Sequence, residues 1–188
     1  DALEKSGKRD NTIIIFTSDH GFHLGEHDFW AKVSLRDESA KVPLIISVPG
    51  KKPAVCDSFV ELLDLYPTLS SLCGLPKQDR LQGKDISPML DDPSYEVREE
   101  AFCVAPMRTG FLLRNKKWAF MQYGEKLPAQ LKGGFEHGRN GIELFDMEKD
   151  PHQFTNLADT VEFQPVVQSF RKKLEQKLAA IRDCDLKK

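Results

Sequence analysis

The feature that most constrains the fold of this chain is an unbroken apolar run, Thr12–Phe16, which ends shortly before Asp19-His20-Gly21. Four β-branched residues followed by a phenylalanine predict a strand over Thr12–Ser18, buried on both faces as in a parallel sheet. The run VPLIISV at residues 42–48 predicts a second buried strand, closed by a Pro-Gly pair. The connection over residues 19–41 is long, and long ordered loops in compact domains are usually functional. The sequence therefore predicts a functional loop between two buried strands.

The rest of the chain predicts a helical region, a second sheet and a long terminal helix. Leucines along Asp57–Leu75 predict a helix that Pro67 divides in two, because proline removes a backbone donor, and Gly74 is its expected stop. Short strand-like runs follow, and a turn at Asn115–Lys117 joins two of them as a hairpin. An apolar residue every three to four positions predicts a helix over Val161–Asp183. The expected strands are Ala101–Val104, Gly110–Leu113, Trp118–Tyr123 and Ile142–Met147.

The bulk properties are those of an α/β protein in two parts, 1–92 and 93–188, with the polar stretch Asp91–Ser94 as the boundary. A net charge of −2 does not favour binding to nucleic acid. No apolar run is long enough to span a membrane, and none has the pattern of a signal peptide. The first residue is Asp1 rather than methionine, so we expect further sequence to precede it. The four cysteines form no CxxC pair, which predicts buried or free thiols, although export would allow a disulfide of unspecified pairing.

The opening strand ends at two potential metal ligands, the carboxylate of Asp19 and the imidazole of His20. Side chains of neighbouring residues leaving a strand can point at one ion where the chain turns at Gly21. The carboxylate suits a hard divalent cation, and the imidazole widens the choice to manganese, iron or zinc. Two ligands do not complete a site, so others must come from elsewhere. Taken alone, the tripeptide is more typical of a strand-ending turn with a capping aspartate.

Residues further along the loop extend the chemistry. Lys32 lies thirteen residues after Asp19, and its ammonium beside a metal suits a tetrahedral oxyanion such as sulfate or phosphate. His23 and His27 are spaced so that a helix would place them on one face. The His-Glu-x-x-His order of zinc proteases is absent, because Glu26 sits beside the second histidine. We predict that His23 faces the substrate as a proton donor and that His27, with Glu26, holds the loop.

At this point the sequence resembles a known family. TSDHGFHLGEHDFWAK and VPLIISVPG resemble the type I sulfatases of the alkaline phosphatase superfamily, most closely the iduronate-2-sulfatase branch, with choline sulfatases nearby. VELLDLYPTLSSLCGLP, LQGKDISPML and IELFDMEKDPHQFTNLAD extend the resemblance over nearly the whole chain. The resemblance implies the C-terminal portion of an alkaline-phosphatase-like α/β/α sandwich over 1–92. It implies a small α+β subdomain over 93–188, with a short antiparallel sheet and a long C-terminal helix.

The resemblance implies a sulfuric ester hydrolase that acts on a sulfated sugar or a small sulfate ester. Asp19 and His20 correspond to the family's metal ligands, usually for calcium, and Lys32 to the lysine that binds the sulfate group. The family's nucleophile is a cysteine converted to formylglycine in a C-x-P-S-R-type motif, which this chain lacks, as it lacks the family's paired aspartates. The N-terminal part of the same enzyme is therefore the implied partner. In the implied mechanism a metal-bound formylglycine hydrate attacks sulfur, and His23 protonates the leaving alcohol.

Two other functions stay open. Asp-His-Gly also occurs in phosphomonoester and phosphonate hydrolases of the same superfamily, and Lys32 could bind phosphate equally well. The chain alone could also be a non-catalytic fragment that needs its N-terminal partner. Family resemblance implies export to the periplasm, the exterior or the lysosome. Candidate specificity segments are residues 33–41, 107–109 and 124–141, the last with His137 and Arg139.

Overall fold

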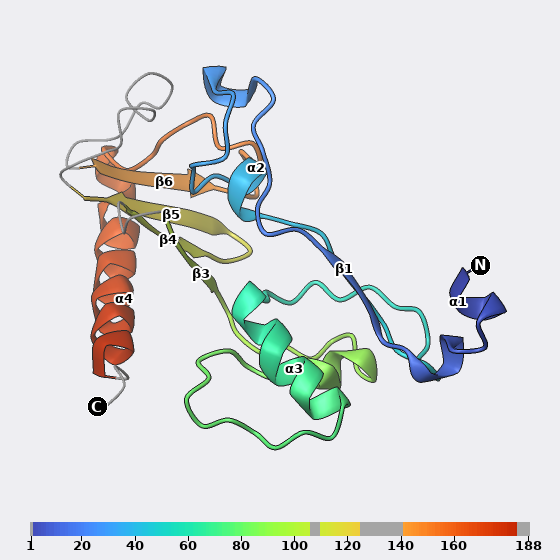
Figure 1. The fold of residues 1–188 in the computed structure, drawn as a ribbon. Coiled ribbons are helices and arrows are strands. Elements are labelled where there is room, and N and C mark those ends of the chain that lie inside the picture. The colour runs from blue at the N-terminus through green and yellow to red at the C-terminus, as the bar shows by residue number, and fades with distance from the viewer. Residues whose placement is uncertain (1, 106–109, 125–140, 184–188) are drawn as a thin grey trace. The chain divides into compact units, whose positions relative to one another are not determined.

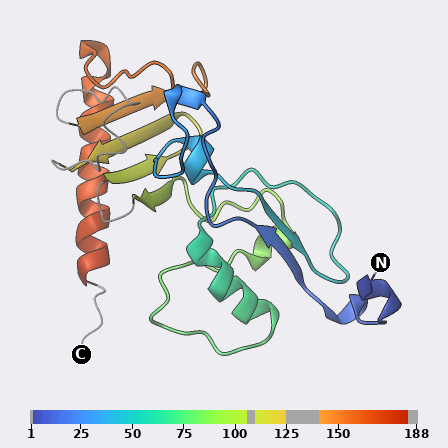
Figure 2. The same cartoon turned by 45° about the horizontal axis from the view of Figure 1, so that its top comes forward.

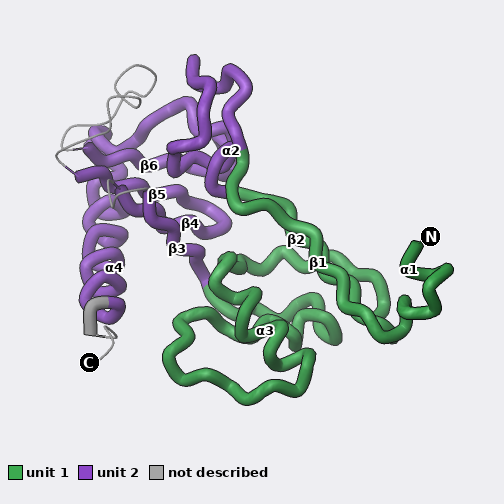
Figure 3. The backbone as a smooth tube through the Cα atoms, viewed as in Figure 1, with its two compact units in different colours: residues 1–21, 41–98 green, residues 22–40, 99–188 purple. Residues whose placement is uncertain are grey.

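The computed structural model describes residues 2–105, 110–124 and 141–183. The chain forms two compact units (Figures 1 and 3). Unit 1 contains residues 1–21 and 41–98, and unit 2 contains residues 22–40 and 99–188. Residues 22–40 of the loop between the two predicted opening strands therefore belong to unit 2, whereas the strands and residues 19–21 belong to unit 1. The predicted division into a catalytic part and a C-terminal subdomain at residue 92 stays a prediction.

Unit 2 is built on a four-stranded antiparallel sheet in the order β3-β4-β5-β6. Its strands are β3 (Ala101–Val104), β4 (Gly110–Arg114), β5 (Trp118–Tyr123) and β6 (Ile142–Asp146). The predicted hairpin turn is confirmed, because the Asn115 side-chain oxygen accepts hydrogen bonds from the Lys117 and Trp118 amides at 3.1 and 2.8 Å. All four strands agree with the sequence prediction to within one residue at each end.

A long helix covers one face of this sheet. The 3₁₀ turn Val161–Phe163 leads into α4 (Gln164–Asp183), which runs across the strands (Figure 2). Leu113, Phe120 and Leu144 of the sheet pack with Val167, Phe170 and Leu174 of the helix, all of them buried. The Phe120 and Phe170 rings are stacked, with centroids 5.5 Å apart. The apolar stripe read from the sequence is therefore the side of α4 that faces the sheet, which confirms the predicted terminal helix.

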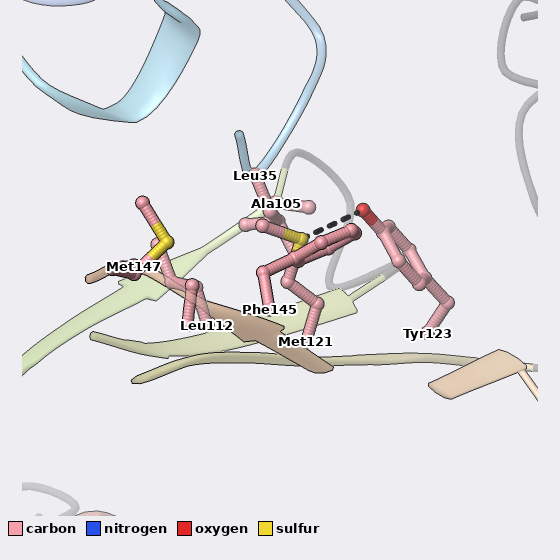
Figure 4. Packing of buried hydrophobic residues seen from close by; sticks show 8 residues of the cluster. Leu35, Ala105, Leu112, Met121, Tyr123, Phe145 and Met147 are labelled. Atoms are coloured by element: carbon pink, nitrogen blue, oxygen red, sulfur yellow. Dashed lines mark hydrogen bonds between the residues drawn. The ribbon is translucent and has the colours of Figure 1, made fainter. Parts of the chain in front are cut away.

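Residues 22–40 cover the opposite face of the same sheet. This segment contains the 3₁₀ turn Glu26–Asp28 and the short helix α2 (Asp37–Ala40). Leu35 is fully buried and packs in one cluster with Leu112, Met121 and Phe145 of the sheet (Figure 4). Burying a leucine of this kind stabilises the folded state by roughly 1.5–3 kcal/mol. The functional loop predicted from the sequence is thus a packed layer of unit 2.

The opening strands of unit 1 differ from the prediction. After α1 (Ala2–Lys5) and a 3₁₀ turn at Arg9–Asn11, β1 (Ile14–Thr17) pairs antiparallel with β2 (Leu44–Ser47). The predicted parallel sheet, buried on both faces, is wrong for the described chain. Phe16 and Ile45 oppose each other and are 61% and 60% exposed. The reason is that this sheet has two strands, so the apolar side chains of one face meet water instead of a packed layer.

The helical region of unit 1 is shorter than predicted, and Pro67 does not divide it. A 3₁₀ turn at Leu62–Asp64 precedes α3 (Leu65–Leu72), and a further 3₁₀ turn follows at Ser87–Leu90. Pro67 lies in the first turn of α3, where a proline is tolerated because the amide it lacks would have no helical partner. The predicted stop is confirmed, since Gly74 has a φ of +66° and the Leu75 amide bonds the Ser70 carbonyl at 2.8 Å.

A buried ion pair ties the start of α3 to the end of unit 1. The Asp64 carboxylate is fully buried and accepts hydrogen bonds from the Glu61 and Lys84 amides, each at 2.8 Å, and from the Arg98 guanidinium at 2.7 Å. Burial alone would raise the pKa of Asp64, but these hydrogen bonds hold it below its usual range. The carboxylate is therefore ionised in the folded protein.

Three further predictions concern single features. No helix among the described residues is long and apolar enough to cross a membrane. Cys56 and Cys73 are free thiols, as predicted. The candidate specificity segment 107–109 lies outside the described residues, and so do Cys184 and all of the 124–141 segment except its two ends, with His137 and Arg139 among them.

Candidate active-site loop

The end of β1 presents Asp19 and His20 at the surface of unit 1. The Asp19 side chain is 85% exposed, and its Oδ2 lies 3.6 Å from His20 Nε2. His20 Nδ1 lies 2.8 Å from the Gly21 carbonyl, so that nitrogen carries the proton and Nε2 offers its lone pair. The other Asp19 oxygen accepts the His20 amide at 3.1 Å. Both potential ligand atoms therefore point the same way, as the sequence predicts for neighbouring residues leaving a strand.

This pair fits part of a metal site. A carboxylate oxygen and a neutral imidazole nitrogen within 4 Å are suitable donors for a divalent cation, and the Gly21 carbonyl fixes the imidazole orientation. Among the described residues no group of three or more His, Cys, Asp or Glu could hold a metal ion. Asp19 and His20 could supply two ligands, and the prediction that others come from elsewhere stays a prediction.

His23, the predicted proton donor, lies in unit 2 and is fully buried. Its ring packs edge-on against Phe29, with centroids 5.2 Å apart, and lies 6.0 Å from the His27 ring. Burial lowers the pKa of His23, which favours the neutral imidazole. The proton-donor role stays a prediction, and what the structure describes is an imidazole inside the packed loop.

His27 and Glu26 each contact another residue of the loop. The spacing of His23 and His27 is not helical, because Gly25 and His27 have φ values of +122° and +58°. His27 Nε2 lies 3.7 Å from a Glu38 carboxylate oxygen. Glu26 instead accepts the Leu24 amide at 2.6 Å, and this hydrogen bond lowers the pKa of Glu26. The predicted supporting role stays a prediction, and the structure gives each of the two residues a separate contact.

Lys32 combines an exposed side chain with a fixed backbone. Just before it, the Ala31 carbonyl accepts the His23 amide at 2.8 Å. The Lys32 carbonyl itself accepts the Ser34 amide at 3.0 Å and the Ser39 hydroxyl. Ser34 and Ser39 are both buried, whereas Lys32 is exposed. The backbone of Lys32 is therefore fixed, and its exposed ammonium is a suitable ligand for a tetrahedral anion.

The residues that hold this loop were not found from the sequence. Arg36 is 4% exposed and Glu143, on β6, is fully buried, and their side chains are 3.2 Å apart. Gln153 is also fully buried and accepts the Asp37 amide at 2.9 Å. One signal was available, because a glutamate inside the apolar strand IELFD needs a buried partner. Nothing in the sequence specified that the partner lies more than a hundred residues earlier.

Comparison with known proteins identifies the family of this chain. Residues 25–180 match the family described as N-sulphoglucosamine sulphohydrolase, C-terminal. The chain belongs to this sulfatase family. It is 32% identical over 186 residues to arylsulfatase K of Gallus gallus, covering 91% of this chain and 32% of that protein. The comparisons support the sulfatase family but not the narrower resemblance to iduronate-2-sulfatase.

Two solved structures share the fold of this chain. The chain is 25% identical to BT4656, solved in complex with its substrate D-glucosamine-2-N,6-O-disulfate, with a TM-score of 0.76 over 97% of this chain and 37% of that one. It is 25% identical to the phosphonate monoester hydrolase of Agrobacterium radiobacter, with a TM-score of 0.75 over 95% of this chain and 37% of that one. The predicted α/β fold with a small antiparallel sheet and a long C-terminal helix is therefore confirmed. The chain spans about a third of the length of these relatives.

Proposed function

We propose that the protein is a sulfuric ester hydrolase that cleaves a sulfate ester of a sulfated sugar. The observation that carries this proposal is the placement of Lys32, whose side chain is exposed while its carbonyl is held by two buried serines. Membership of the sulfatase family supports it, as does the likeness to BT4656, whose substrate is a sulfated sugar. Lys32 would contact the sulfate oxygens and neutralise charge that builds up on them during cleavage.

Asp19 and His20 would hold a divalent cation in this proposal, with calcium as the expected ion. The donor set fits, since calcium prefers carboxylate oxygens and the imidazole has its Nε2 lone pair available. When bound, the cation supplies Lewis-acid stabilisation of negative charge at the reacting group. Within this chain, Asp19 and His20 bind and orient, and Lys32 attracts the anion.

His23 is the proposed proton donor to the leaving alcohol, and its environment makes that assignment easy to test. A donor must carry its proton at the start of the reaction, but burial lowers the pKa of His23. If His23 is the acid, the rate should fall on the alkaline side of a pKa that disappears in a His23→Gln variant. If the rate of the His23→Gln variant still falls at alkaline pH, His23 serves only in packing the loop.

The remainder of the active site is proposed to come from the N-terminal part of the same enzyme. That part would supply a formylglycine nucleophile and the remaining metal ligands. The face of β1 and β2 with Ile14, Phe16 and Ile45, which are 41%, 61% and 60% exposed, supports such a partner. The 188-residue chain alone should then show no turnover of an aryl sulfate. Export of the whole protein is part of the same proposal.

A phosphonate or phosphate monoester hydrolase is the second candidate. The specific observation in its favour is the likeness to the Agrobacterium radiobacter enzyme. Because Lys32 is a point charge, it binds a phosphoryl group as readily as a sulfuryl group. Assaying the full-length enzyme on matched aryl sulfate and aryl phosphonate esters distinguishes the two, since the preferred ester has the higher kcat/KM.

The test of the proposed function is a Lys32→Ala variant of the full-length enzyme. Removing one charged group that stabilises the transition state costs about 10²–10³-fold in turnover. We therefore expect kcat/KM on a sulfate ester to fall by at least that factor, with an unchanged melting temperature because Lys32 is exposed. Lys172, an exposed lysine of α4 in the same unit as Lys32, is the matched control, and Lys172→Ala should leave turnover unchanged. Wild-type kcat/KM in Lys32→Ala would reject the proposal.

A further inference from the structure

The loop that carries Lys32 is anchored by a buried guanidinium. Arg36 Nη2 lies 3.2 Å from Glu143 Oε1, and Nη1 donates to the Gln153 carbonyl. The guanidinium carbon lies 4.7 Å from the centroid of the Phe145 ring. The exposed fractions of the Arg36 and Glu143 side chains are 5% and 0%, so the pair is shielded from water. The planar fork of arginine thus meets two acceptors and one aromatic face in a single orientation.

The acceptors are themselves fixed. The Tyr123 hydroxyl lies 3.4 Å from the second Glu143 oxygen. Burial raises the pKa of Tyr123 well above its usual value, so the hydroxyl keeps its proton and can donate it. Beside this carboxylate, the Gln153 side chain accepts the Asp37 amide at 2.9 Å. Glu143 is therefore held by Arg36 on one oxygen and by Tyr123 of the sheet on the other, and Arg36 contacts both the sheet and the segment after β6.

Short contacts connect this anchor to Lys32. The Arg36 amide donates to the Ser34 hydroxyl at 3.0 Å, and the Ser34 amide donates to the Lys32 carbonyl at 3.0 Å. On the other side, the Arg36 carbonyl accepts the Ser39 amide at 2.9 Å, and the Ser39 hydroxyl donates to the Lys32 carbonyl. Two routes of hydrogen bonds thus run from Arg36 to the same backbone oxygen of Lys32. A shift of Arg36 would move the lysine.

A buried ion pair is a poor source of net stability, because desolvation of both charges offsets their attraction. Such a pair can instead fix the orientation of the segments that carry it, because two charged groups interact favourably in only a few geometries. We propose that Arg36 and Glu143 are positioning residues that set the place of the Lys32 ammonium at the sulfate group. This inference rests on the proposed function. It goes beyond that function by assigning a role to β6, whose Glu143 lies 111 positions after Lys32 in the chain.

The experiment replaces the pair by apolar side chains of similar size, Arg36→Met with Glu143→Leu, in the full-length enzyme. Such replacements are often neutral or stabilising, so the melting temperature should stay near that of the wild type. The probe for the anion site is competitive inhibition by inorganic sulfate. We expect the sulfate Ki and the KM for a sulfate ester each to rise about tenfold or more, since misplacement by about 1 Å can cost up to 10²-fold.

A double-mutant cycle with Lys32→Ala separates positioning from general structure. If the pair acts through Lys32, its replacement should change the sulfate Ki little once the lysine is gone. An equal loss with and without Lys32 would overturn the positioning role. The matched control is the partly exposed pair Lys173–Glu100, 2.9 Å apart in the same unit, whose replacement by Met and Leu should leave Ki and KM unchanged.

Two outcomes keep this inference apart from the proposed function. Wild-type turnover in Lys32→Ala rejects the proposed function. An inactive Lys32→Ala variant together with a wild-type sulfate Ki in the Arg36→Met, Glu143→Leu variant rejects the positioning role alone. Should the double replacement not fold, Glu143→Gln decides, because it keeps the size of the side chain but removes the negative charge that holds the Arg36 guanidinium. A raised sulfate Ki in this variant supports the inference, and an unchanged one overturns it.

Discussion

Residues 19–21 and residues 22–40 are neighbours in sequence but are held in different ways. Asp19 and His20 are oriented by hydrogen bonds that reach at most two residues along the chain, and the Asp19 side chain is 85% exposed. The segment after them is fixed by buried partners on β6 and on the turn that follows it. The comparison shows that the loop of the proposed anion ligand has buried, long-range support within this chain. The chain contains only the local support for the proposed metal ligands.

The largest expected effect follows from the first half of this comparison. Asp19→Asn in the full-length enzyme should remove the bound metal and lower sulfate-ester turnover by orders of magnitude, because the carboxylate is one of few charged donors at the site. The melting temperature in excess chelator should equal that of the wild type, because the side chain is exposed. Metal content is measured by elemental analysis alongside activity.

Asp28 provides the control for this experiment. It is an exposed aspartate in the adjacent loop, and Asp28→Asn should keep both metal and turnover. Stoichiometric calcium in the Asp19→Asn enzyme would remove Asp19 from the ligand set. A large loss of stability in chelator would show that Asp19 has structural contacts beyond its immediate neighbours.

The next effect concerns the packing of the loop. Leu35 is fully buried against the sheet, so Leu35→Ala should lower the free energy of unfolding by about 2–5 kcal/mol. Leu24, in the same segment, is 64% exposed, and Leu24→Ala should change the free energy of unfolding by no more than about 0.5 kcal/mol. Denaturant unfolding of the full-length protein measures both. Equal small effects would mean that residues 22–40 are not a packed layer.

The same contrast explains how far the sequence could predict this molecule. The sheet strands, the hairpin at Asn115 and the terminal helix were predictable, because their signals are periodic patterns and turn residues that act within a few positions. Asp19 and His20 were predictable as a pair for the same reason, since their arrangement is local. The partners of Arg36 were not predictable. A buried charge requires a partner, but the sequence does not specify which residue supplies it.

The two corrections have the same physical origin. The apolar runs of β1 and β2 were interpreted as belonging to a doubly covered sheet, but composition does not report how many strands share the sheet. Pro67 was interpreted as a break, but the effect of a proline depends on its position in the helix, and α3 begins at Leu65, so that Pro67 falls in its first turn. In each case the structural context of the residues, rather than their type, determined the outcome.

The smallest expected effect tests the buried histidines of the loop. Burial lowers the pKa of His27 from the ordinary 6.5, and the Arg36 guanidinium and His23 lower it further, while Glu38 and Glu143 oppose them. The unfolded chain therefore binds a proton more readily than the folded one below about pH 6.5. Stability contributed by the neutral ring is present above that pH and is lost as the pH falls through it, by at most about 1.4 kcal/mol per pH unit for one proton.

A His27→Gln variant isolates this contribution. Between pH 7.5 and 5.5 the melting temperature of the wild-type protein should fall further than that of the variant. The melting temperature of the exposed control, His152→Gln, should follow that of the wild type. If the variant instead loses more, protonation strengthens the contact with Glu38, which lies 3.7 Å away, by more than burial opposes it. Acid would then tighten the loop that carries Lys32 rather than loosen it, so the sign of this difference reports whether burial or the carboxylate dominates at His27.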